Sequence, residues 1–121
     1  METYTEEYLK FLKKNIEEKD ISKAVKELTL QFLDKYNDYI QIHVETLPKG
    51  KYRISDNNFI EEKIKEYTNI RQEDVITLIV QNILATGVKY DSNTKEFYIE
   101  CEKENIGKSI HTMLHAMITL K

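Results

Sequence analysis

Three aspartates are the residues of this sequence whose type and placement could most readily support catalysis. Asp34 and Asp38 flank a short polar elbow between two apolar runs, and Asp56 directly follows a third apolar run. Carboxylates that converge at strand ends are ligands that Mg²⁺ or Mn²⁺ accepts, and Lys35 or Arg53 could neutralise a phosphate beside them. The pattern therefore allows a metal-dependent nuclease or phosphodiesterase.

The same aspartates also have a purely structural interpretation. Aspartate at a strand-to-turn or strand-to-helix junction commonly accepts hydrogen bonds from nearby backbone N–H groups. The acid-x-Lys motif that many nucleases carry on a strand is missing, because Glu61-Glu62-Lys63 has that spacing within a helical pattern. We therefore favour structural roles for all three aspartates and keep the nuclease, with bound magnesium or manganese, as an alternative.

Two histidines have a spacing that a metal site could use. His111 and His115 are four residues apart, so both lie on one face of a helix and two imidazoles could share a metal ion. The glutamate of a zinc protease is missing, since Thr112 follows His111, and His43 would have to supply a third ligand from the sheet. We expect histidines at the boundary of the core instead, and neither a metal nor another cofactor.

The remaining reactive groups form no recognisable motif. Cys101 is the single cysteine and alternates with Phe97 and Ile99, which predicts a small core residue and not a nucleophile. No serine lies in the glycine-flanked elbow of a hydrolase, and the three glycines are too isolated to form a phosphate-binding loop.

Length and composition predict one domain, residues 1–121, with its own hydrophobic core. The formal net charge is -3, and Arg53 and Arg71 are the two arginines. This balance argues against direct nucleic-acid binding, for which a basic, arginine-rich face is typical. A lone cysteine, an acidic N-terminus and a longest apolar run of only 75–84 predict a cytoplasmic protein that does not bind membranes.

The periodicity of apolar residues predicts an α+β domain. Thr3 and Glu6 form a capping box for a first helix that should end near Lys19. Strands are predicted at 24–33, 39–45, 51–55, 88–90 and 96–102, and further helices after a cap at Asp56, at 71–86 and at 105–120. The expected order is α-β-β-β-α-α-β-β-α, with about five antiparallel strands and helices packed on one face.

The helix predicted at 71–86 is apolar on more than one side. Such a helix either lies at the centre of the core or leaves part of its surface as an interface. With the eight tyrosines of the chain, this surplus of apolar surface makes a homodimer a possible outcome.

Four strings resemble a known family: FLDKYNDYIQI at 32–42, YRISD at 52–56, ILATGV at 83–88 and HTMLHAM at 111–117. They resemble the bacterial and phage proteins catalogued as domain of unknown function 1828. The resemblance implies a phage, prophage or mobile-element setting and no activity. In that family a second acid and a glycine often follow the position of Asp56, where this chain has Asn57 and Asn58, and glutamine usually replaces His115. These departures argue against a family-wide carboxylate cluster or metal site.

An acidic surface is the remaining candidate for function. Glu96, Tyr98, Glu100, Glu102 and Glu104 alternate along and beyond one predicted strand. Such a face could mimic phosphates toward a basic, nucleic-acid-binding partner, although charged strand faces also serve as solvated surface or as guarded sheet edges.

We expect a non-enzymatic accessory protein of a phage or mobile element that binds and blocks a protein of its bacterial host. Its most concrete form is an inhibitor of a nucleic-acid-guided defence nuclease, an anti-CRISPR type of role. The nuclease built on Asp34, Asp38 and Asp56 is one alternative. An antitoxin-like or DNA-associated regulator is another.

Overall fold

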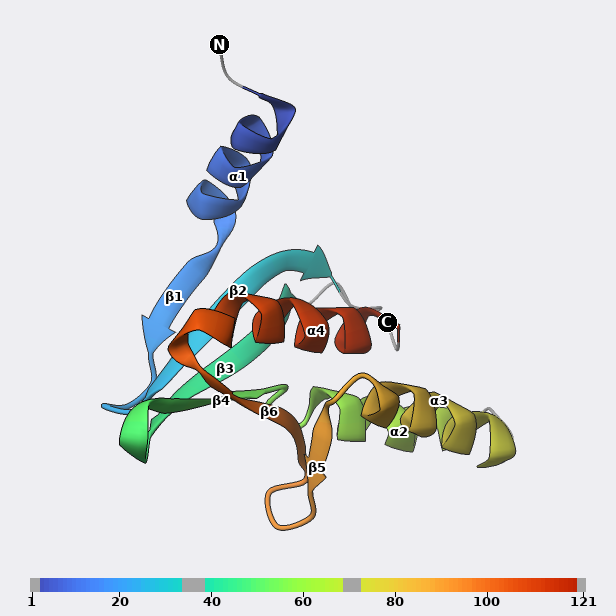
Figure 1. Ribbon diagram of the computed structural model, residues 1–121. Helices are drawn as coiled ribbons and strands as arrows, with labels where there is room; N and C mark the ends of the chain where they lie inside the picture. Colours follow the sequence, from blue (N-terminus) through green and yellow to red (C-terminus); the bar gives the residue numbers. More distant parts are fainter. Residues whose placement is uncertain (1–2, 34–38, 69–72, 120–121) are drawn as a thin grey trace.

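A six-stranded antiparallel sheet organises the protein, which we describe from a computed structural model in residues 3–33, 39–68 and 73–119. The strand order across the sheet is β1-β2-β3-β4-β6-β5 (Figure 1). The elements in chain order are α1 (Tyr4–Asn15), β1 (Glu17–Asp20), β2 (Val25–Leu33), β3 (Tyr39–Leu47), the 3-10 turn η1 (Pro48–Gly50), β4 (Lys51–Ser55), α2 (Phe59–Thr68), α3 (Glu73–Ala85), β5 (Lys89–Asp91), β6 (Glu96–Glu102), the 3-10 turn η2 (Lys103–Asn105) and α4 (Ile106–Ile118).

The predicted α+β class and the helices on one face are confirmed, with one strand more than expected. The first helix ends at Asn15, not near Lys19, and Glu17–Asp20 form β1 at the edge of the sheet. All four side chains of β1 are exposed. A strand without a buried face shows no apolar alternation, so its pairing with β2 leaves no signal in the sequence.

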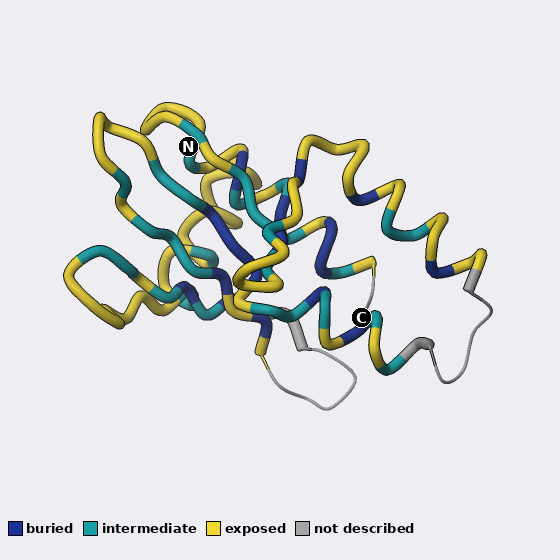
Figure 2. The backbone as a smooth tube through the Cα atoms, turned by 90° about the horizontal axis from the view of Figure 1, so that it is seen from below, coloured by how far each residue is buried: buried dark blue, intermediate teal, exposed yellow. Residues whose placement is uncertain are grey.

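The core lies between the sheet and α4, which crosses β3, β4 and β6. Alternation along the strands directs Ile42 and Ile54 toward α4, where Met113 and Met117 meet them, and all four are fully buried (Figure 2). The other buried members of this cluster are Leu28, Leu30, Ile40, Ile60, Ile83, Val88, Phe97 and Ala116. This packing leaves the opposite face of the sheet, which we call the open face, to polar side chains.

Helix α3 does not occupy the centre of the core, so that alternative for the 71–86 helix is wrong. It packs against α2 at the periphery and buries Ile76 and Ile83, whereas Val75, Leu78 and Leu84 are exposed. The predicted C-terminal cap is confirmed, because Gly87 has φ +100° and its N–H reaches the carbonyl of Leu84 at 3.2 Å. The apolar residues of a helix show how much surface it can bury but not which elements it packs against. The sequence therefore did not show that α4, and not α3, takes the central place.

Helix α1 stands clear of the rest of the chain (Figure 1). Its predicted capping box is confirmed: the hydroxyl of Thr3 accepts from the Glu6 N–H at 3.1 Å, and the Thr3 N–H donates to the Glu6 carboxylate at 3.4 Å. None of its residues is buried, and Ile16 alone joins it to β1.

Deleting residues 1–15 should change the free energy of unfolding by less than about 1 kcal/mol, because α1 buries no side chain against the domain. Urea unfolding followed by circular dichroism measures this. Met113→Ala serves as the comparison and should cost about 2–5 kcal/mol, since Met113 is fully buried. A loss above about 2 kcal/mol that is the same at low and high protein concentration would show that α1 stabilises its own domain.

No helix in the described ranges is long and apolar enough to cross a membrane.

Candidate functional site

Asp56 is the one member of the aspartate trio that the structure describes, and it is a structural cap. Asp34 and Asp38 lie outside the described residues, as does Lys35. The Asp56 side chain is buried, and its two oxygens accept N–H groups from Ile60 at 2.7 Å, Phe97 at 3.1 Å and Asn58 at 3.2 Å. The predicted cap of α2 is thus confirmed, and the same carboxylate also holds the start of β6.

Burial raises the pKa of Asp56 from 3.8 to about 6, although the three backbone N–H groups act in the opposite direction. The negative charge of Glu96 adds to the rise. A carboxyl group that is enclosed by backbone donors in this way presents little surface to a metal ion. The three-aspartate hypothesis therefore stays a prediction, with Asp56 already engaged by the fold.

A cavity of about 270 Å³ lies beside Asp56, at the end of the sheet where β3 begins and α2 starts. Lys63 is buried in its wall, with Nζ 5.1 Å from the centre of the Phe59 ring and 3.9 Å from the Glu66 carboxylate. The residues that line this cavity are Tyr39, Gln41, Asp56, Asn57, Asn58, Phe59, Glu62, Lys63 and Glu66. The sequence patterns did not single out Lys63, because a lysine in an amphipathic helix normally faces water.

Asp56→Ala should lower the free energy of unfolding by about 2–4 kcal/mol, because three buried N–H groups lose their acceptor. Chemical denaturation measures the loss. Asp20→Ala, at an exposed position of β1, is the matched control and should change little. Equal effects of the two substitutions would contradict the role of Asp56 as a buried cap.

The raised pKa also predicts a pH dependence with a definite sign. The folded state holds the Asp56 proton more tightly than the unfolded chain, so this group contributes stability below about pH 4 that is lost as the pH rises through about 6. Asp56→Asn removes the titration. The stability difference between wild type and Asp56→Asn should therefore fall by up to about 3 kcal/mol from pH 4 to pH 7. A difference that grows over this range would contradict the raised pKa.

Two asparagines after Asp56 shape the turn into α2. Asn57 and Asn58 have φ values of 51° and 70°, in the left-handed region that glycine and asparagine tolerate best. The side-chain amide of Asn58 donates to the carbonyls of Thr94 and Lys95, both at 2.9 Å. These positive φ values explain why glycine suits this turn. The Asn58 side chain also binds the β5–β6 turn, which a glycine could not do.

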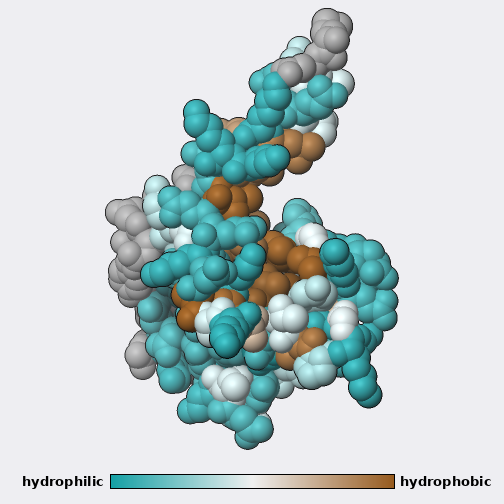
Figure 3. Space-filling view, turned by 90° about the vertical axis from the view of Figure 1, so that its left-hand side faces the viewer, coloured by the Kyte–Doolittle hydropathy of each residue, from teal (hydrophilic) through white to brown (hydrophobic). Residues whose placement is uncertain are grey.

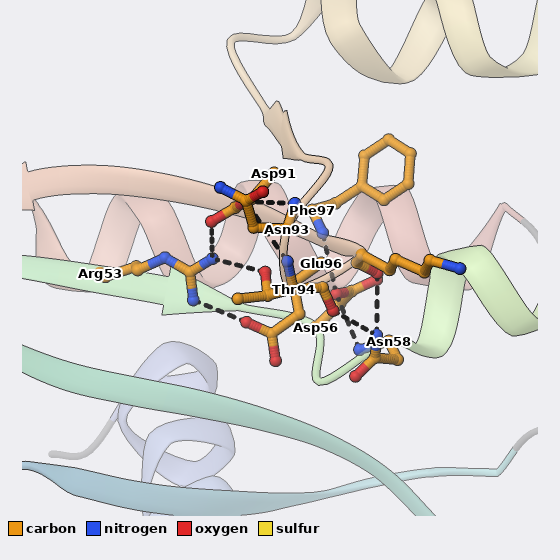
Figure 4. A network of polar contacts seen from close by, with 9 residues as sticks. Arg53, Asp56, Asn58, Asp91, Asn93, Thr94, Glu96 and Phe97 are labelled. Carbon is orange, nitrogen blue, oxygen red and sulfur yellow. Dashed lines mark hydrogen bonds and ion pairs between the residues drawn. The ribbon is translucent and has the colours of Figure 1, made fainter.

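Arg53 is the centre of a polar network on the open face (Figure 4). Its guanidinium contacts the carboxylate of Glu96 at 2.7 Å and that of Asp91 at 3.4 Å, and it lies 4.7 Å from the centre of the Tyr98 ring. Only 14% of the Arg53 side chain is exposed. The pKa of Asp91 is lowered, first by the N–H of Asn93 and further by Thr94 and Arg53. Arg53 thus ties the β5–β6 hairpin to β4.

Arg53→Ala should lower the free energy of unfolding by about 2 kcal/mol, because it breaks a largely buried ion-pair network. Arg53→Lys should recover only part of this loss, since an ammonium cannot hold two carboxylates in the same fork. Lys51→Ala is the control, because Lys51 pairs with Glu102 at the surface, and it should leave stability unchanged within error. Thermal unfolding of the three variants distinguishes these outcomes, and an Arg53→Ala variant as stable as Lys51→Ala would contradict the network.

The predicted acidic surface is brought together by β6 and η2. Glu102 contacts Lys51 at 2.9 Å, which raises the pKa of Lys51 and lowers that of Glu102; Glu104 and Glu100 add to the rise at Lys51. All three glutamates are exposed and gather around this lysine. Tyr98 differs from the expectation of an exposed contact residue, because the Arg53 guanidinium covers its ring.

The open face as a whole carries more acids than bases. Cross-strand register assigns strand residues to this face: Glu17, Glu27, Glu45, Asp91, Glu96, Glu100 and Glu102 are acidic, and Lys19, Lys51, Arg53 and Lys89 are basic. No helix in the described part of the chain covers this face (Figure 1). The acidic surplus is therefore accessible to a partner.

The histidines are not brought to a common site. His111 and His115 are exposed on α4, whereas His43 lies on the open face with Nε2 2.9 Å from the Glu27 carboxylate. The sheet therefore separates His43 from the other two. Within the described ranges, no group of three or more His, Cys, Asp or Glu side chains could hold a metal ion. Cys101 is half-buried against the core, as its alternation predicted.

A groove between α3 and α4 was not foreseen from any motif. Its volume is about 270 Å³, and we call it the α3–α4 groove; it is lined by Ile79, Asn82, Ile83, Thr86, His115, Ala116 and Thr119. Exposed Val75 and Leu78 lie on the same helix. The one sequence signal for this groove was the surplus of apolar residues in the 71–86 helix. That surplus predicted an interface but not its position.

The fold and these sites define an α+β domain with helices on one face of its sheet and an acidic, uncovered opposite face. The chain belongs to the family described as domain of unknown function DUF1828, whose model matches residues 31–120. The match begins within β2, so α1 and β1 lie before it. Comparison with curated proteins and with solved structures gives no match. The resemblance predicted from the four strings is thereby confirmed.

Proposed function

We propose that this protein acts by binding another protein through the acidic part of its open face. The observation that carries the proposal is a cluster of three exposed glutamates: Glu100 and Glu102 lie on a sheet face that no helix of the described chain covers, and Glu104 lies in η2 directly after it. A non-catalytic role agrees with the engagement of two of the residues that the nuclease alternative would use. Asp56 is occupied by backbone N–H groups, and Arg53 is occupied by carboxylates.

The geometry favours a basic partner of the kind that binds nucleic acid. Glu100 and Glu102 are two positions apart on β6, so their side chains project from the same face about 7 Å apart. A row of negative charge at this spacing can enter a groove built for a phosphate backbone. The same acidic surplus disfavours direct DNA binding, as an antitoxin-like regulator would need.

The most concrete partner is a nucleic-acid-guided defence nuclease of a bacterial host. This choice follows the phage and mobile-element setting that the family resemblance implies, and it places the protein in the host cytoplasm. By occupying the nucleic-acid channel, the acidic surface would exclude the target. Such competition needs no catalysis by the inhibitor.

A reconstituted cleavage assay tests this function. A purified guide-directed nuclease is incubated with target DNA and increasing amounts of the protein, and the cleavage rate is measured. We expect at least tenfold inhibition that weakens at high salt. Glu100→Lys/Glu104→Lys should weaken inhibition at least tenfold, whereas Glu17→Lys, on the distant edge strand β1 of the same face, should not.

Three outcomes would overturn the proposal. Absence of inhibition across representative guide-directed nucleases would remove the concrete partner. Equal inhibition by the double variant and the wild type would remove the acidic surface as the contact. Cleavage of DNA or RNA by the protein alone with Mg²⁺ or Mn²⁺ would favour the nuclease built on Asp34, Asp38 and Asp56.

A further inference from the structure

Helix α1 presents an apolar stripe away from its own domain. Tyr4, Tyr8 and Phe11 follow one another at helical spacing on one face, and each of the three is more than half exposed. Figure 3 shows the helix standing clear of the body, with brown, hydrophobic surface at its lower end near the body. An exposed apolar stripe of this size on a projecting element is characteristic of an interaction surface.

The length of α1 adds a second argument. It has 12 residues, and isolated helices of that length are only marginally stable in water. The capping box and the exposed Glu7–Lys10 pair stabilise it only slightly. A packing partner for the stripe would supply the stability that its own domain does not.

The α3–α4 groove has the properties of a receiving site for such a helix. Its walls combine apolar side chains with the small residues Ala116, Thr86 and Thr119, which allow a helix to approach closely. The exposed apolar side chains of Val75 and Leu78 continue this surface along α3. An amphipathic helix in a groove between two helices is a common mode of recognition.

One chain cannot bring these two surfaces together. Figure 1 places α1 and α3 at opposite ends of the molecule. Ile16 is the single residue between α1 and β1, and β1 is fixed by its pairing with β2. We propose that α1 of one copy packs into the α3–α4 groove of a second copy, and that the reciprocal contact completes a two-fold homodimer.

Charge favours this occupant in an antiparallel arrangement. Lys13 and Lys14 in the last turn of α1 would meet Asp74 in the first turn of α3. The two helices also match in length, with 12 and 13 residues. Opposite charges thus meet where the end of α1 lies beside the start of α3.

The available area is also that of a stable dimer. Burying the exposed parts of the three aromatic side chains in both arms, with an equal area of receiving surface, removes on the order of 1,500–2,000 Å² from water. This inference goes beyond the proposed function and is independent of it, because the groove lies on the helical side of the sheet and the acidic surface lies on the open face.

The mass of the full-length protein in solution, measured by size-exclusion chromatography with light scattering, tests the arrangement. We expect twice the mass of one chain for the wild type at micromolar concentration. Tyr8→Ser/Phe11→Ser in the arm and Val75→Ser/Leu78→Ser at the groove should each raise the dimer dissociation constant at least about 100-fold. Ile21→Ser, at another exposed apolar position, is the matched control and should stay dimeric.

Mixing the two double variants separates arm exchange from other dimers. The arm variant keeps an intact groove and the groove variant keeps an intact arm, so the mixture should form a heterodimer through one of the two contacts. An unchanged circular dichroism spectrum and a cooperative unfolding transition verify that both variants fold, as expected for substitutions at exposed sites. A monomeric wild type, a groove variant that stays dimeric or a mixture without heterodimer would each overturn the proposal.

Discussion

The buried carboxylate of Asp56 is the interaction on which the rest of the structure depends. It lies between the end of β4 and the start of α2. It also accepts the N–H of Phe97 in β6, 41 positions further along the chain. Removing a carboxylate from water is costly, and here three charge-assisted hydrogen bonds from backbone N–H groups offset much of that cost. The part of this cost that the hydrogen bonds do not offset raises the pKa of Asp56. One side chain therefore closes the β4–β6 pairing and starts a helix at the same point.

Arg53 and Asn58 extend this junction to the hairpin of β5 and β6. Arg53 holds the carboxylates of Asp91 and Glu96 from the open side of the sheet, and Asn58 holds the backbone of the intervening turn. Hydrophobic packing under α4 acts on the opposite face. Arg53, Asp56 and Asn58 thus place the β5–β6 hairpin against the rest of the sheet.

Local patterns in the sequence were sufficient to predict the elements in which buried and exposed side chains alternate. Alternation predicted β3, β4 and β6, and junction chemistry predicted the cap at Asp56. The hydrogen bond from the Phe97 N–H to Asp56 and the ion pair between Arg53 and Glu96 join residues more than 40 positions apart. No local pattern in the sequence contains such pairs. Strand β1 and the peripheral position of α3 were missed for a related reason, because both depend on pairing partners and not on their own periodicity.

The two unsatisfied apolar surfaces have a consequence for how the acidic surface would work. If α1 and the α3–α4 groove engage a second copy on the helical side of the sheet, the open face of each copy stays uncovered. A dimer would then present two acidic clusters on one particle, and a partner with two basic sites would gain effective concentration from the second contact without any new chemistry. Because α1 precedes the segment that matches the family model and buries none of its residues, this second contact would come from a part of the chain outside the matched segment.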